Sequence, residues 1–166
     1  MTLSRDLLKQ AASLAKREPK HPTQASLRRA VSTAYYAMFH LMGEAVAARF
    51  SPSSMHDFVR RGLDHGRMRQ AADHVKNLSV NRATQAKFSM AGVAVSQDLA
   101  TVATAIGTLQ HARHEADYNL AHRYTRAEVD DLIRTANAAF AAWGRIATVA
   151  EADAFIVALL FWNDRR

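Results

Sequence analysis

The chain has no cysteine, and only three of its 166 residues are proline and six are glycine. Without thiols, disulfide bridges and thiolate metal sites are excluded. The scarcity of proline and glycine, together with abundant alanine, favours helices throughout. No stretch reaches the roughly 18 apolar residues of a membrane-spanning helix, and the first ten residues lack the apolar run of a signal peptide. We therefore expect an all-α, cytoplasmic protein that does not enter a membrane.

Acidic residues are also fewer than basic ones, 15 against 22, which gives a formal net charge of +7. Arginine is much the commoner base. A guanidinium group matches the geometry of phosphate, so this composition is typical of a protein that contacts RNA or a nucleotide. Solubility alone would also explain an excess of positive charge, and composition does not separate the two explanations.

The stretch from Leu27 to Phe50 is the longest predominantly apolar segment and predicts a central helix. Its small and apolar side chains cover nearly the whole circumference at 100° per residue. Thr23 is the predicted N-cap, and the helix is expected to end near residue 49, before a Ser-Pro break. One narrow line of polar side chains interrupts the apolar surface at spacings of four, three and four: Arg29, Thr33, Tyr36 and His40. Such a line on a buried helix is expected to face a cleft or a buried polar cluster.

Periodicity and capping residues predict the other helices. A first helix is expected from the N-cap Ser4 to residue 16, and a weaker helical segment over 54–75, with bends at Gly62 and Gly66 and a connection over 76–92. A long helix is predicted over 94–122. Thr125 and Glu128 form a capping box for the next helix. A short apolar helix over 151–162 either closes the bundle or meets a second copy. Residues 1–166 thus predict a single domain, an up-and-down bundle of four to five main helices plus the short C-terminal helix.

An arginine interrupts the apolar stripe of the 94–122 helix. The stripe runs through Leu99, Val102, Ile106 and Leu109, and the same spacing then reaches Arg113. Asp117 follows one turn later and is predicted to pair with Arg113, which lowers the cost of burying the charge. A charged pair where leucine is expected is either structural or part of a site. We expect Asp117 to be an anionic partner for Arg29 as well.

Several ring side chains lie on another side of the same helix, within about 80° of arc: His111, His114, Tyr118 and His122. Three histidines at helical spacing are able to bind a metal, but no carboxylate joins them. We therefore interpret this side as a solvated or interface surface and expect neither a metal nor a cofactor.

Two motifs occur together in this chain, LRRAVSTAYYAMFH in the central helix and RHEADY near the end of the 94–122 helix. Together they resemble the HEPN family of small helical bundles, in particular the branch with a YYAMFH helix and a late R-x-x-A-D-Y motif. The resemblance covers residues 11–145. It implies a homodimer, and in many relatives a minimal nucleotidyltransferase is encoded alongside. A number of relatives are metal-independent ribonucleases, toxins of toxin–antitoxin pairs, whose two subunits form one composite RNA cleft.

The resemblance also implies a catalytic signature of arginine, a polar residue and then histidine after four to six intervening residues. Arg113 matches the arginine and His114 the polar residue. Tyr118 and Leu120 stand where the histidine is expected, and eight residues separate Arg113 from His122. On a continuous helix these two side chains would point about 180° apart.

If the protein cleaves RNA, the ribose 2′-hydroxyl attacks the adjacent phosphate with help from a base and a positive charge. Arg113 would supply the charge, and His114, His40 or His122 the base. Tyr36 and Tyr118 would hold RNA bases by stacking, whereas Tyr35 is expected in the core.

Three hypotheses follow. The first is an RNA- or nucleotide-binding protein of a toxin–antitoxin-like or nucleotidyltransferase-associated system, whose polar cluster comprises Arg29, Tyr36, His40, Asp117 and Tyr118 around Arg113. The second is a metal-independent endoribonuclease in which Arg113 and His114 are catalytic. The third is a non-catalytic dimeric scaffold. The missing histidine favours binding over cleavage.

Overall fold

The computed structural model describes residues 2–50, 52–80 and 94–161. This part of the chain forms seven α-helices and one 3-10 turn, and it contains no strand. The elements in chain order are α1 (Leu3–Ala15), α2 (Gln24–Ala47), η1 (Ser53–Met55), α3 (His56–Arg61), α4 (His65–Val80), α6 (Gln97–Tyr118), α7 (Arg126–Ile146) and α8 (Ala150–Phe161). The predicted all-α fold is confirmed. None of the helices within the described ranges is long and apolar enough to cross a lipid bilayer.

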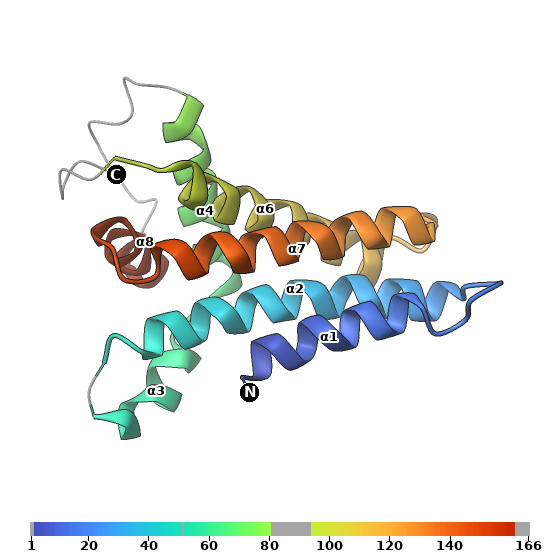
Figure 1. Cartoon of the computed structure of the whole chain (residues 1–166), viewed down its shortest axis with the longest axis horizontal. Helices are drawn as coiled ribbons and strands as arrows, with labels where there is room; N and C mark the ends of the chain where they lie inside the picture. Colours follow the sequence, from blue (N-terminus) through green and yellow to red (C-terminus); the bar gives the residue numbers. More distant parts are fainter. Residues whose placement is uncertain (1, 51, 81–93, 162–166) are drawn as a thin grey trace.

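The long helices lie side by side, and α2 is at their centre (Figure 1). Helices α1 and α2 form one antiparallel pair, α6 and α7 another, and α4 is steeply inclined to them. Helix α2 contacts α1, α3, α6, α7 and α8, and most of its residues are buried, as the sequence predicts for a central helix. Among its polar residues, Ser26, Ser32 and Thr33 are buried against other helices, whereas Arg29 is exposed.

The short helix α8 closes one end of the bundle. It packs against α4 and α2, and its side chains Phe155 and Leu159 are fully buried. Of the two alternatives for this apolar segment, the structure shows the first. Val157 and Phe161 remain exposed on its outer side.

Two predicted helix starts are confirmed and one is wrong. Thr23 accepts a hydrogen bond from the backbone N–H of Ser26, and Thr125 forms the predicted capping box with Glu128. Helix α1, however, begins after Thr2, and Ser4 lies buried in its first turn. Its N–H and hydroxyl donate to the Glu44 carboxylate at 3.1 and 2.7 Å. A carboxylate from α2 thus satisfies this end of α1, where a negative charge is favourable.

The break between α3 and α4 differs from the prediction. The chain bends at Gly62 as expected, but Gly66 lies inside α4, because Asp64 accepts the N–H of Arg67 at 2.9 Å and starts the helix there. Helix α4 then continues to Val80, so the predicted connection is wrong over 76–80, and its remainder lies outside the described residues. Helix α6 starts after its N-cap Ser96 and ends at Tyr118, four residues before the predicted end.

Candidate functional site

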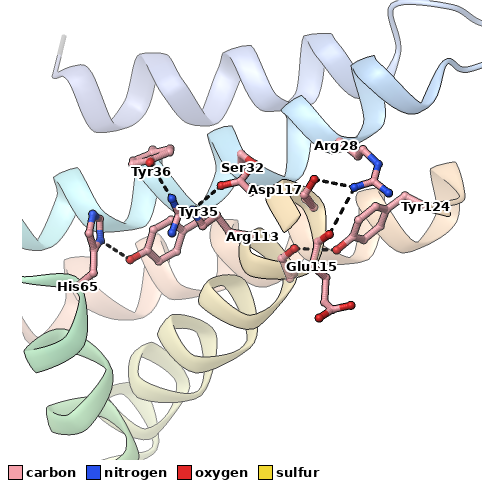
Figure 2. A network of polar contacts seen from close by, with 11 residues as sticks. Arg28, Ser32, Tyr35, Tyr36, His65, Arg113, Glu115, Asp117 and Tyr124 are labelled. Atoms are coloured by element: carbon pink, nitrogen blue, oxygen red, sulfur yellow. Dashed lines mark hydrogen bonds and ion pairs between the residues drawn. The ribbon is translucent and has the colours of Figure 1, made fainter. Parts of the chain in front are cut away.

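Arg113 projects from the last third of α6 and lies at the centre of a polar cluster (Figure 2). Its side chain is 21% exposed, and its Nε lies 2.7 Å from Oδ2 of Asp117. The predicted ion pair is therefore present. The Nε–H of Arg113 does not point at the carboxylate closely enough to form a hydrogen bond, so the contact is an ion pair only.

Three tyrosine rings surround the Arg113 guanidinium. Its central carbon lies 5.8, 5.7 and 5.9 Å from the ring centres of Tyr35, Tyr36 and Tyr118. Its Nη2 donates to the Tyr36 hydroxyl at 3.3 Å. Contacts of this kind attract a cation to the aromatic face. Burial disfavours the charged form of Arg113, but Tyr36 and Asp117 outweigh it and raise the pKa, so the group is a fixed positive charge.

Asp117 connects α6 to α2. Its second oxygen, Oδ1, accepts the hydroxyl of Ser32 at 2.7 Å, so one carboxylate contacts both Ser32 and Arg113. The predicted contact with Arg29 is wrong, because Ser32 and Arg28 lie on the side of α2 that faces α6, whereas Arg29 points toward α1.

The predicted polar line on α2 faces a groove between α1 and α2. The groove has a volume of about 520 Å³, and it is lined by Leu3, Leu7, Gln10, Leu14, Arg29, Thr33, Tyr36 and His40. Burial lowers the pKa of His40, against the opposing effect of Glu44. In the described part of the chain, neither Arg29 nor His40 forms a hydrogen bond or ion pair with Arg113. Tyr36 alone belongs to both places, so the predicted single cluster is two neighbouring features that share one tyrosine.

His65, the first residue of α4, belongs to the Arg113 cluster and was not predicted. The hydroxyl of Tyr35 lies 2.6 Å from His65 Nδ1, and the imidazole stacks on Phe39 with 4.1 Å between ring centres. Burial and the charge of Arg113 lower the pKa of His65. The only signal in the sequence is the buried tyrosine itself, since a buried hydroxyl needs a partner.

Arg28 was not predicted either, although it precedes Arg29 in the same motif. Its guanidinium donates to four backbone carbonyls at the end of α6, those of Glu115, Ala116, Asn119 and His122. Tyr124 adds a bond from its hydroxyl to the carbonyl of Ala112 at 2.7 Å. The end of α6 is thus fixed by side chains from two other segments (Figure 2).

The histidines of α6 do not gather into one site. His114 is exposed and contacts Tyr118, with 5.0 Å between ring centres, whereas His122 contacts Tyr124 at 4.4 Å. Because α6 ends at Tyr118, the argument that Arg113 and His122 point apart on a continuous helix does not apply. Within the described ranges, no group of three or more His, Asp or Glu side chains is placed to hold a metal ion.

Comparison of the chain with protein family models, curated proteins and solved structures finds no match. The resemblance to the HEPN family therefore depends on the two sequence motifs.

Proposed function

We propose that this protein binds RNA or a nucleotide through Arg113, as a HEPN-type component of a toxin–antitoxin-like or nucleotidyltransferase-associated system. The observation that carries the proposal is a permanently charged guanidinium fixed between Tyr36 and Tyr118, of which Tyr118 is 65% exposed. A phosphate contact beside a ring on which a base stacks is the usual way to bind single-stranded nucleic acid.

Arg113 has donor capacity left for a phosphate oxygen. Among the described residues, no acceptor lies in hydrogen-bonding geometry to its Nη1. Asp117 contacts the guanidinium at Nε only, because its other carboxylate oxygen accepts a hydrogen bond from Ser32. Because Arg113 is anchored by one ion pair and by three rings, little side-chain entropy is lost when a phosphate binds.

The groove between α1 and α2 supports the proposed homodimer. Leu3, Leu7 and Leu14 line one wall, and Leu3 is 55% exposed, so the groove offers an apolar surface on which a second copy could pack. A second copy seated there would lie next to Tyr36, whose hydroxyl accepts a hydrogen bond from Arg113. The proposed nucleotidyltransferase partner is supported by the sequence resemblance only.

Metal-independent RNA cleavage is the second candidate, and one observation favours it. His114, the residue after Arg113, is exposed and contacts Tyr118. Because its ring centre lies 5.0 Å from that of Tyr118, we propose that a nucleotide stacked on Tyr118 brings its ribose 2′-hydroxyl near this imidazole. In this reading His114 is the general base, and Arg113 stabilises the charge on the phosphate in the transition state.

One experiment separates these functions. The purified protein is incubated with labelled single-stranded RNA in EDTA, and both binding and cleavage are measured for wild type, Arg113→Ala and Arg145→Ala. Arg145 is the matched control, because it also pairs with an aspartate, Asp98, but at the other end of α6. We expect RNA affinity to weaken about tenfold or more in Arg113→Ala, because one charge-assisted contact is lost. Affinity is expected to be unchanged in Arg145→Ala.

The remaining outcomes are equally informative. Cleavage in EDTA that disappears in Arg113→Ala identifies an endoribonuclease. A wild type that neither binds nor cleaves RNA, and that also fails to bind mononucleotides, contradicts the proposal and leaves the dimeric scaffold. Thermal unfolding of each variant, followed by circular dichroism, shows whether the bundle is intact.

A further inference from the structure

The end of α6 carries Asp117 and Tyr118, two of the side chains that contact Arg113. The last carbonyls of a helix have no partner within the helix, and an exposed end frays unless other groups bind them. How this end is fixed therefore decides whether the proposed site has a defined shape.

Arg28 supplies the missing donors from α2. Its Nη1 donates to the carbonyl of Ala116 at 2.7 Å and, with a longer bond of 3.4 Å, to that of Glu115. Its Nη2 donates to the carbonyls of Asn119 at 2.8 Å and His122 at 2.5 Å. One guanidinium thus joins the last turn of the helix to the chain that leaves it. A positive charge is also favourable at a helix C-terminus.

The four residues after Tyr118 form a turn that fits around this contact. Oδ1 of Asn119 accepts the N–H groups of Ala121 and His122 at 3.1 and 3.2 Å, and Nδ2 donates to the Glu115 carboxylate at 2.6 Å. These bonds direct the carbonyls of Asn119 and His122 toward Arg28. The turn and the arginine therefore depend on each other.

Arg28 lies one helical turn before Ser32 on α2, and Ser32 donates to Asp117. Tyr118 stands between Ala116 and Asn119, whose carbonyls both bind Arg28. We infer that Arg28 is a positioning residue of the Arg113 site: it fixes the last turn of α6 and so keeps Tyr118 and Asp117 against Arg113. The inference rests on the proposed function of that site. Both terminal nitrogens of Arg28 are already bonded to carbonyls, so it acts through α6 rather than through the ligand.

A second arginine provides a matched control. Arg126, the first residue of α7, donates to the carbonyls of Glu18 and Pro19 in the loop after α1. Its bonds are of the same chemical kind as those of Arg28, but they do not involve α6. Removing it tests the general cost of losing a guanidinium that binds carbonyls.

The test compares Arg28→Gln and Arg28→Lys with Arg126→Gln by two measurements. The first is amide hydrogen exchange across the chain. The second is the affinity for a fluorescent single-stranded RNA of about ten nucleotides, within the usual size of such sites. We expect faster exchange in Arg28→Gln over residues 115–122 and affinity about tenfold weaker, with neither change in Arg126→Gln. Arg28→Lys keeps the charge but is expected to bind fewer carbonyls, so its effects on hydrogen exchange and RNA affinity are expected to be intermediate. If Arg28→Gln does not fold, Arg28→Lys takes its place in both measurements.

Two results would overturn the inference: unchanged exchange over 115–122 in both Arg28 variants, or faster exchange there with wild-type affinity for the RNA. A wild type that does not bind the probe contradicts the proposed function instead, and the exchange measurement still reports whether Arg28 fixes the end of α6.

Discussion

The hydroxyl of Tyr35 lies 2.6 Å from Nδ1 of His65, and this bond joins the middle of the central helix to the first residue of α4. Tyr35 is fully buried, and burial raises its pKa, against the opposing effect of Arg113. Burial of His65 and the positive charge of Arg113 lower the pKa of that imidazole. At neutral pH the two groups therefore meet as a neutral phenol and a neutral imidazole, and the Tyr35 ring centre lies 5.8 Å from the central carbon of the Arg113 guanidinium.

The shifted pKa of His65 predicts that the protein loses stability on mild acidification. Its neighbours are Tyr35, Tyr36, Phe39 and Arg113, with Asp64 and His40 also acting on its charge. The pKa of His65 in the folded state is below the unfolded value of about 6.5. Between these two pKa values the unfolded chain therefore binds more protons than the folded protein does. The free energy of unfolding is thus expected to fall as the pH drops from 6.5 toward the folded pKa.

Urea unfolding between about pH 8 and pH 5 measures this slope. In His65→Gln the slope is expected to decrease, but some of it remains, since burial also lowers the pKa of His40. An unchanged slope in His65→Gln would show that His65 is not the group responsible.

The Tyr35 hydroxyl is predicted to contribute to stability through this bond. Tyr35→Phe keeps the ring contacts but leaves His65 Nδ1 without its partner, which is expected to cost about 1–2 kcal/mol of unfolding free energy. Tyr118→Phe is the control, because that hydroxyl is exposed and has no assigned hydrogen bond within the described residues; a change within about 0.5 kcal/mol is expected. Equal effects of the two substitutions would contradict the assigned role of the Tyr35–His65 bond.

The contact between Ser4 and Glu44 is predicted to attach the start of α1 to α2. Ser4→Ala removes a hydroxyl donated to a carboxylate at 2.7 Å in a buried position, and we expect a loss of about 1–2 kcal/mol in urea unfolding. Ser13→Ala in the same helix is the control, because among the described residues its exposed hydroxyl bonds only the carbonyl of Lys9. A Ser4→Ala protein as stable as Ser13→Ala would refute this prediction.

The exposed ring of Tyr118 is predicted to stack on a base of the ligand. Tyr118→Ala is expected to weaken binding of single-stranded RNA by about 1–3 kcal/mol, whereas Tyr118→Phe keeps the ring and most of the affinity. Leu120→Ala, two residues on and 87% exposed, is expected to bind as the wild type does. Anisotropy titrations of the three variants decide the matter, and equal affinities for the alanine and phenylalanine variants at position 118 would exclude stacking.

The sequence predicts what is local along one helix. The caps at Thr23 and Thr125 follow from residues three apart, and the Arg113–Asp117 pair follows from residues four apart on the same face. The buried nature of α2 also follows from its composition. None of these features depends on how one helix is rotated against another.

The contacts that shape the candidate site are of the opposite kind. They join residues that are far apart in sequence: Tyr35 and His65, Ser32 and Asp117, and Arg28 and the end of α6. These residues meet only because α2, α4 and α6 pack against one another at particular rotations about their axes. The polar line shows this limit. Its spacing predicts that Arg29 and His40 share one face of α2, but it does not predict which helix covers that face. The structure places α1 there.

The salt dependence of RNA binding tests the central claim most directly, because each phosphate contact adds to the slope of log affinity against log salt. We predict that Arg113→Gln binds single-stranded RNA more weakly than wild type at low salt and that its slope is smaller by about one, as expected for one lost phosphate contact. Wild-type affinity and wild-type slope in Arg113→Gln would contradict the claim that Arg113 binds phosphate.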